Sequence, residues 1–322
     1  MKSFSASSLM NETRPFRSKM PTALITGATG FVGSHLARRL VQEGWRVHIL
    51  SRVDSRLAEA EEFAYVINHI YDGSTDSMLN CVVQAKPDVV YHLASLFLSQ
   101  HEVKDVNELI QSNVLFGSQL LEAMKENQVT NLVNTGTSWQ HYNNEDYNPV
   151  CLYAATKQAF EAILEYYVQA CGIKVITLKL FDTYGPDDPR PKLFSLLSAA
   201  ATSGETLDMS GGEQLIDLVH IDDVTEAYII AAQRLIKFRA QQHERYAVSS
   251  GNPMPLRDLV ELYSEVIGSA INVNWGARQY RFREVMKTWT GGSSLEGWQP
   301  KYSLADGMKN SQTKLNKRSS AT

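Results

Sequence analysis

The sequence is poor in the features that mark several protein classes. Its 322 residues include three cysteines (Cys81, Cys151 and Cys171) and ten prolines. No stretch approaches the roughly 18 consecutive apolar residues that span a bilayer, so we expect no membrane partner. The cysteines form no CxxC pair and no metal-ligand spacing, which predicts a reduced, cytoplasmic protein without a metal site.

The chain also lacks an excess of positive charge. It has 31 Lys and Arg against 35 Asp and Glu, a formal charge of -4. This balance supplies no field for gripping nucleic acid and no polybasic membrane anchor, although a local basic pocket for a small anionic substrate is compatible with it. With 43% hydrophobic residues the chain has the composition of a globular protein.

Short apolar runs alternate with amphipathic segments over the first 181 residues. Expected strands lie at 23–26, 47–50, 65–67, 88–93, 131–134 and 174–180, and expected helices at 31–43, 76–85, 104–127 and 153–170. This order predicts an α/β fold, a Rossmann-type doubly wound parallel sheet with right-handed crossovers.

The regular alternation ends near residue 181. Shorter, irregular segments over 182–311 predict a smaller C-terminal substrate-binding part, from which the chain returns to the sheet around 215–235. Residues 1–20 are Ser-rich and basic, with no apolar segment of the secretory type, and residues 312–322 are polar. We expect both ends to be flexible tails around a dinucleotide-binding domain at 21–181 and the smaller part.

A glycine-rich turn joins the first expected strand to the first expected helix. It reads GATGFVG over residues 27–33. Glycines at this junction let backbone N–H groups and the positive end of the helix dipole approach a pyrophosphate. The turn therefore predicts dinucleotide binding, through Gly27, Thr29, Gly30, Phe31, Val32 and Gly33.

The end of the second expected strand bears on which dinucleotide is bound. NAD-binding chains usually carry an Asp or Glu there for the ribose hydroxyls, whereas this chain has Ser51 and Arg52. A carboxylate would repel a 2′-phosphate, and Ser51 with Arg52, helped by Arg38 or Arg39, would attract it. We therefore predict NADP (NADPH), with NAD the less favoured alternative; a solvated surface role for Arg52 remains open.

A Tyr and a Lys four residues apart open the last of the long helices. Tyr153 and Lys157 share one helical face, and a cation beside a phenol favours the phenolate, which suits an acid–base group. Thr137 follows the expected strand at 131–134 and so lies at the carboxyl edge of the sheet, where ligands bind. Together the three residues predict a catalytic site.

Seven segments resemble those of the extended short-chain dehydrogenase/reductases that act on nucleotide sugars. They span about Pro21 to about Gly307 in the family's order: GATGFVGSHL, YHLAS, NVLFGSQLLEA, YAATK, LFDTYGPDD, DLVHIDDV and GWQPKYSLADG. The resemblance implies that Tyr153 is the general acid–base, that Lys157 lowers its pKa and binds ribose, and that Thr137 orients the sugar.

The same resemblance assigns further binding residues. It implies that Asn113 supports Lys157 through a water, that Asp72 approaches the adenine, and that Leu93, Ala94 and Ser95 border the nicotinamide half. Many relatives dimerise through two long helices, here 104–127 and 153–170, so a homodimer is also expected.

Two departures from the family pattern affect the substrate site. Asp182 stands where most relatives have Asn, and Ile216 stands where many have an Arg that contacts the sugar diphosphate. Lys192 or Arg281 could serve instead, although either could equally be a surface cation. His92 and His220 fall in apolar strands and are expected to be structural, whereas His141 is expected in a polar loop facing the substrate cleft.

The residues after Thr137 narrow the reaction. Sugar 4,6-dehydratases place Asp-Glu there, because loss of water needs an extra acid and base. This chain has Ser138, Trp139 and Gln140, so dehydration is disfavoured. Ser138 and Trp139 offer a hydrogen bond and a flat apolar surface to a deoxysugar, although Trp139 could equally be a packing residue.

The stretch from Asn134 to Glu161 resembles the CDP-abequose synthase-like group of 4-reductases, enzymes of O-antigen-type deoxysugar biosynthesis. Our hypothesis is NADPH-dependent reduction of the C4 ketone of a nucleotide-linked 4-keto-6-deoxysugar. A nucleotide-sugar 4-epimerase is the alternative enzyme, and a dinucleotide-sensing binding protein is the non-enzyme alternative.

Overall fold

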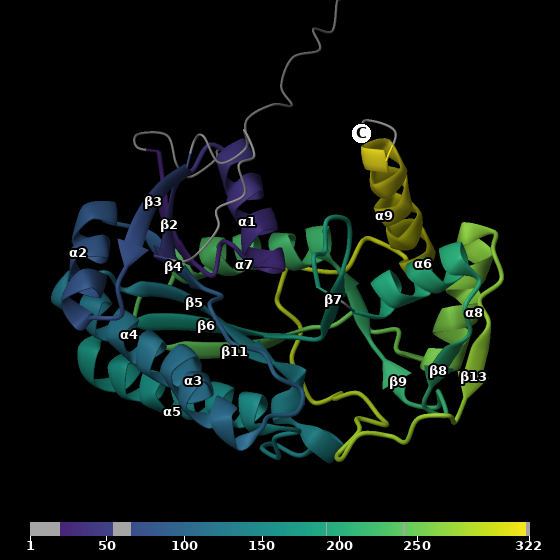
Figure 1. Ribbon diagram of the computed structural model, residues 1–322. Coiled ribbons are helices and arrows are strands. Elements are labelled where there is room, and N and C mark those ends of the chain that lie inside the picture. The colour runs from purple at the N-terminus through teal and green to yellow at the C-terminus, as the bar shows by residue number, and fades with distance from the viewer. Residues whose placement is uncertain (1–19, 54–65, 191, 241, 320–322) are drawn as a thin grey trace, which may run out of the picture.

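A seven-stranded, wholly parallel sheet forms the centre of the larger lobe (Figure 1). The computed structural model describes residues 20–53, 66–190, 192–240 and 242–319. The sheet order is β11-β6-β5-β4-β1-β2-β3. Its strands are β1 (Thr22–Thr26), β2 (Arg46–Arg52), β3 (Val66–Tyr71), β4 (Val89–His92), β5 (Asn131–Thr137), β6 (Lys174–Leu180) and β11 (His243–Val248). The predicted Rossmann-type fold class is therefore confirmed.

Helices cover both faces of this sheet, as Figure 1 shows. One face packs on α1 (Phe31–Gln42) and α7 (Ile221–Ile236), and the other on α2 (Thr75–Ala85), α4 (Phe116–Glu126) and α5 (Leu152–Cys171). The inner strands are rich in apolar residues because they are buried on both sides. In β1, for instance, Leu24 and Ile25 are both fully buried but belong to the two different cores.

The point where the strand order reverses lies between β1 and β4. From β1 the chain builds outward to β2 and β3, then returns to β4 and continues through β5 and β6 on the other side. Such a reversal leaves a crevice at the carboxyl ends of the two central strands, and ligands of open α/β sheets bind in that crevice. The loops after β1, β4 and β5 all meet there.

The long helix expected over 104–127 is interrupted. A 3-10 turn, η2 (Val103–Asp105), leads into α3 (Val106–Ile110), and a π-helical turn, η3 (Gln111–Leu115), separates α3 from α4. A π-helical turn inside an α-helix frequently marks a functional position. The hydrophobic period predicted the helix but cannot reveal a one-residue bulge, here around Asn113.

A smaller lobe stands beside the carboxyl edge of the sheet. Its helices are α6 (Leu193–Ser203), α8 (Leu256–Ile267) and α9 (Leu304–Ser319). Short strand pairs support them: β7 (Asp182–Tyr184) with β10 (Leu218–His220), β8 (Leu207–Met209) with β13 (Val273–Trp275), and β9 (Leu215–Ile216) with β12 (Met254–Pro255). Leu197, Leu259, Tyr263 and Met308 are buried in its own hydrophobic core.

Two segments from the C-terminal half of the chain, α7 and β11, belong to the larger lobe. The chain returns to the sheet through α7, and then adds β11, which pairs with β6 along its length. The part expected at 182–311 therefore also supplies an edge strand of the large sheet. The sequence did not predict this strand because β11 mixes polar and apolar residues. At the C-terminus α9 continues to Ser319, within the expected tail at 312–322; the tail expected over 1–20 lies, apart from Met20, outside the described residues.

The described part of the chain holds neither a membrane-spanning helix nor a cluster of metal ligands. None of the helices in this part of the chain is both long and apolar enough to cross a membrane. Over the same ranges, no three or more His, Cys, Asp or Glu side chains gather in a way that could hold a metal ion. Cys81, Cys151 and Cys171 are free thiols.

Candidate active site

The glycine-rich turn after β1 is shaped for close approach of a ligand. Gly27 has a φ of +75°, and a Cβ there would lie 2.6 Å from the backbone nitrogen of Ala94. A Cβ on Gly33 would overlap the Gly27 carbonyl oxygen. Gly30 is the N-cap of α1 and offers no side-chain cap, so the first N–H groups of the helix face outward. Only glycine fits this cradle, and its donors suit a pyrophosphate.

The turn is fixed to β4 by hydrogen bonds. The Thr26 hydroxyl accepts from the Ala94 N–H at 3.2 Å and pairs with His92 Nδ1 at 2.8 Å. The Leu93 N–H donates to the Thr26 carbonyl. Leu93 and Ala94, predicted to border the nicotinamide, therefore lie directly against the phosphate turn.

The residues expected near the adenosine lie at the ends of β2 and β3. Ser51 is buried, and its hydroxyl donates to the Asn68 side chain at 2.9 Å. Arg52 is exposed at the end of β2. The exposed Asp72 accepts hydrogen bonds from the Ser74 N–H and hydroxyl. Of the two residues at the end of β2, Arg52 is therefore the exposed one, while the Ser51 hydroxyl is held by the neighbouring strand.

The three proposed catalytic side chains come from two neighbouring elements. Thr137 is the last residue of β5 and is buried, while Tyr153 and Lys157 lie in the first turns of α5. The hydroxyls of Thr137 and Ser95 both interact with the Tyr153 phenol. The structure therefore brings together Ser95 after β4, Thr137 at the end of β5 and Tyr153 at the start of α5, at the carboxyl edge of the sheet.

Burial controls the acidity of this group. It raises the pKa of Tyr153, the nearby Cys151 thiol adds to the rise, and the hydrogen bonds with Ser95 and Thr137 oppose it. Burial also lowers the pKa of Lys157 to about 8, against an opposing effect of Glu161. Desolvation by the protein thus outweighs any help that Lys157 gives the phenolate, in contrast to the simple cation–phenol argument.

Asn113 fixes the loop after β4 through four hydrogen bonds of its side chain. Its carbonyl oxygen accepts from the Ser95 hydroxyl at 3.0 Å and from the Leu96 N–H at 2.8 Å. Its amide donates to the Leu96 carbonyl and to the Thr156 hydroxyl. The π-helical turn therefore places one buried amide where it ties Ser95 to α5.

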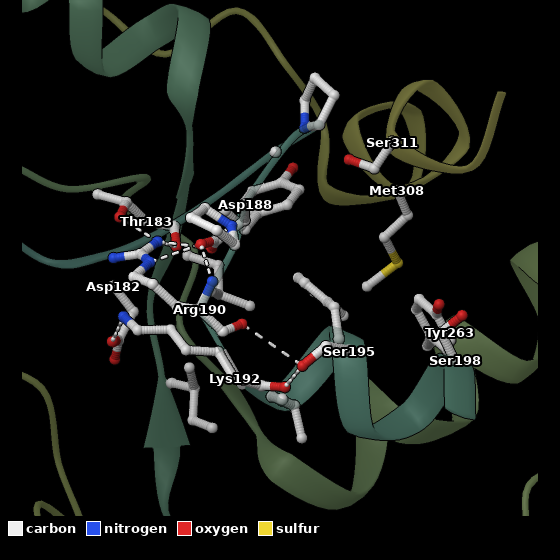
Figure 2. A pocket seen from close by; sticks show the side chains of 18 of the residues that line it. Asp182, Thr183, Asp188, Arg190, Lys192, Ser195, Ser198, Tyr263, Met308 and Ser311 are labelled. Carbon is white, nitrogen blue, oxygen red and sulfur yellow. Dashed lines mark hydrogen bonds and ion pairs between the residues drawn. The ribbon is translucent and has the colours of Figure 1, made fainter. Parts of the chain in front are cut away.

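A cavity of about 990 Å³ opens beside these residues, between the sheet edge and the smaller lobe. Figure 2 shows its wall at α6, α8 and α9, where the Met308 side chain on α9 extends toward Ser198 and Tyr263, and Ser311 also lines the cavity. Arg190 closes another part of the wall through two bonds to Asp188, and its guanidinium lies 4.5 Å from the centre of the Phe31 ring.

Aromatic rings and two cations surround the mouth of this cavity near Tyr153. The Phe97 ring lies 4.9 Å from that of Tyr153 and 5.5 Å from that of Trp139. Lys192 Nζ lies 5.8 Å from the Phe97 ring and 3.7 Å from Asp182 Oδ1, and the Arg281 guanidinium lies 5.7 Å from the Trp139 ring. Lys192 and Arg281, the two cations that the sequence offers for a diphosphate, both line the cavity.

Three side chains of this site gave no clear signal in the sequence. Phe97 lies in an irregular loop, and only its position after YHLAS could have suggested it. Gln140 and Glu161 are buried and bonded to each other at 2.8 Å. His141, expected to face the cleft, is instead buried with its Nε2 2.7 Å from Lys179 Nζ, because the chain turns inward after Thr137.

Comparison with known proteins places this site in a family. The profile of the NAD dependent epimerase/dehydratase family matches residues 23–246, more than half of the chain. The chain is 26% identical over 293 residues to a CDP-abequose synthase of Salmonella muenchen, covering 89% of this chain and 95% of that protein. It is 28% identical over 306 residues to a UDP-glucose 4-epimerase of Mycolicibacterium smegmatis, covering 88% and 95%.

Solved structures agree on the fold. A UDP-glucose 4-epimerase of Thermotoga maritima, solved with UDP-glucose, superposes with a TM-score of 0.79 at 22% identity, covering 92% of this chain and 99% of that one. A UDP-glucose 4-epimerase of Thermus thermophilus, solved with NAD, gives 0.75 at 23% identity, covering 91% and 98%. The chain belongs to the NAD dependent epimerase/dehydratase family.

Proposed function

We propose that the protein reduces the C4 ketone of a nucleotide-linked 4-keto-6-deoxysugar, with NADPH as the reductant and a CDP-linked sugar as the favoured substrate. The observation that carries the proposal is the Thr137, Tyr153 and Lys157 group, followed by Ser138-Trp139-Gln140 where a dehydratase needs two acids. The likeness to CDP-abequose synthases supports it. Cytoplasmic deoxysugar biosynthesis of the O-antigen type is part of the same proposal.

The cradle after β1 fits a nicotinamide dinucleotide. Gly27, Gly30 and Gly33 leave room for the pyrophosphate, and the exposed first-turn donors of α1 complement its charge. When bound, the dinucleotide supplies the hydride equivalent for reduction of the carbonyl. We assign the 2′-phosphate to Arg52; the neighbouring structures solved with NAD make NAD the competing choice.

Each catalytic side chain then has a role set by its position. Thr137 donates a hydrogen bond to the carbonyl oxygen, and Tyr153 delivers the proton as that oxygen becomes an alkoxide. A phenol whose pKa is raised by burial is protonated at neutral pH, as a donor must be. Lys157 holds the ribose and offers its charge to the developing phenolate.

The cavity supplies a place for the nucleotide diphosphate. Lys192 and Arg281 both line it, and each pairs with an acidic side chain: Lys192 with Asp182 and Arg281 with Glu284. This pair would replace the Arg that relatives carry where this chain has Ile216. Trp139 and Phe97 would pack against the sugar ring.

A nucleotide-sugar 4-epimerase is the second candidate, favoured by the likeness to UDP-glucose 4-epimerases. Both candidates need the same acid–base group, so replacing Tyr153 with Phe tests them jointly against a non-catalytic binding protein. We expect Tyr153→Phe to abolish turnover and to leave dinucleotide binding within about twofold of the wild type. Unchanged turnover would discard the assigned role.

We also propose a homodimer. Val106, Ile110 and Leu115 along α3 and η3, and Tyr166 on α5, are exposed apolar side chains on the helices that relatives use. Analytical ultracentrifugation should give a dimer that Ile110→Glu converts to a monomer, and a wild-type monomer at micromolar concentration would contradict it.

A further inference from the structure

A buried network of charged and polar side chains lies behind Thr137. At its centre is Glu161, which is 2% exposed and lies on α5 one turn after Lys157. Its Oε1 accepts from Gln140 Nε2 at 2.8 Å, and its Oε2 accepts from Arg245 Nε at 3.2 Å. Lys179 Nζ lies 3.9 Å from Oε1. A carboxylate this deeply buried is costly unless each of its oxygens is paired, and here both are.

The network reaches the catalytic turn through Gln140. The Thr137 N–H donates to Gln140 Oε1 at 3.0 Å, which closes the 3-10 turn η4 (Ser138–Gln140), and the Thr137 hydroxyl accepts from the Trp139 N–H. Gln140 is fully buried and also donates to Gln158 Oε1 at 2.6 Å. The Gln140 side chain thus links the Glu161 carboxylate to the backbone of Thr137, the residue proposed to orient the carbonyl.

The network also reaches Lys157. Residues four apart on a helix lie on the same face, so the Glu161 carboxylate faces the Lys157 side chain. The other titratable groups near Lys157 are Tyr153 on α5 and His92 on β4. Those near Glu161 are Lys179 on β6, His141 after η4, and Arg245 and His243 on β11. Burial is the main cause that lowers the pKa of all three histidines, which leaves them neutral near pH 8.

We propose that Glu161 is a positioning residue of the active site: it fixes the Thr137 turn through Gln140 and supplies the negative charge that faces Lys157. The inference rests on the proposed function, because it assumes that Lys157 binds the dinucleotide ribose. It accounts for a buried carboxylate that lines neither the cavity nor the glycine-rich turn.

The test uses the full chain and two matched variants. Glu161→Gln removes the charge but keeps an oxygen that can accept from Gln140. Glu165→Gln removes the same charge one turn farther along α5, where Glu165 also pairs with Arg245 and His243. NADPH and NADH binding is followed by fluorescence from about pH 6 to about pH 10, with no sugar present.

Binding by the wild type should weaken as the pH rises through the Lys157 pKa, which burial lowers to about 8. In Glu161→Gln this midpoint should move down by about one pH unit, because a nearby opposite charge favours the ammonium form. In Glu165→Gln it should stay in place. Equal shifts in both variants, or none in Glu161→Gln, would overturn the proposal.

A double variant separates this role from folding. Glu161→Gln alone leaves Lys179 without its nearest carboxylate, so the protein can lose stability. Adding Lys179→Met removes the second charge and should restore stability while keeping the lowered midpoint; a return of the midpoint to the wild-type value would also overturn the proposal.

The turn is tested through Gln140. Gln140→Leu should lower kcat for the sugar at least tenfold and leave the affinity for NADPH unchanged. Equal losses of kcat and of NADPH affinity would indicate a purely structural role. Because the binding experiment needs no sugar, it stands even where no nucleotide sugar is turned over, which is the outcome that would refute the proposed reaction instead.

Discussion

The buried ammonium of Lys157 should make the protein less stable than it could be. Burial lowers the Lys157 pKa from the ordinary 10.5 to about 8, so the folded state disfavours the charged form by about 3 kcal/mol at 1.4 kcal/mol per unit. Lys157→Met keeps the length and apolar stem of the side chain and removes the charge. We expect the variant without dinucleotide to be more stable at neutral pH by about 3 kcal/mol.

The difference in stability between the wild type and Lys157→Met should depend on pH. Below about pH 8 the amine is protonated in both the folded and unfolded states, so the cost is complete. As the pH rises from about 8 to 10.5, the folded protein has released a proton that the unfolded chain still holds, and the stability of the wild type rises relative to the variant. The difference between the two proteins should therefore close across this window.

The assay is guanidinium unfolding of both proteins without dinucleotide, at about pH 7 and about pH 10. Lys104→Met, which changes an exposed lysine, is the control and should be neutral at both. Adding NADPH should reverse the order, because only the wild type gains the full stabilisation of binding. A Lys157→Met variant less stable than the wild type at pH 7, with a gap independent of pH, would refute the reasoning.

Three further changes test the binding sites. Gly33→Ala should abolish dinucleotide binding measured by fluorescence, because its Cβ would overlap the Gly27 carbonyl; normal binding would show that the turn is not the cradle. Arg281→Gln should raise KM for the nucleotide sugar about tenfold with dinucleotide affinity unaltered, whereas an unaltered KM would remove Arg281 from the diphosphate site. Arg52→Ser should weaken NADPH at least tenfold and leave NADH unaffected in isothermal titration; a parallel loss of both would argue against a 2′-phosphate contact.

Much of the larger lobe could be predicted because its signals are local. A strand that is buried on both faces is rich in apolar residues, so β1, β4 and β6 stand out from the sequence around them. The phosphate turn is equally local, because three glycines must satisfy one backbone path. Tyr153 and Lys157 share a helix, and their spacing alone places them together.

The remaining features depend on contacts between distant segments. β11 is a polar-looking run whose place at the sheet edge is set by β6, more than sixty residues earlier. The His141 side chain points inward because its Nε2 bonds with Lys179 Nζ and its ring stacks on Trp289. The helical period of the sequence likewise cannot show that Asn113 lies in a π-helical turn. The pKa of Tyr153 depends mainly on its burial, and the spacing between Tyr153 and Lys157 does not predict that burial.

The reaction that we propose is net reduction of a nucleotide-linked 4-keto-6-deoxysugar. Purified protein should be incubated with NADPH and CDP-, dTDP-, GDP- and UDP-linked 4-keto-6-deoxysugars, with the absorbance of NADPH and the sugar products followed together. We expect NADPH to be consumed in a one-to-one ratio with the alcohol formed, fastest with the CDP-linked sugar, and we expect no consumption by Tyr153→Phe. Interconversion of nucleotide-sugar isomers without net NADPH oxidation would contradict it and identify an epimerase.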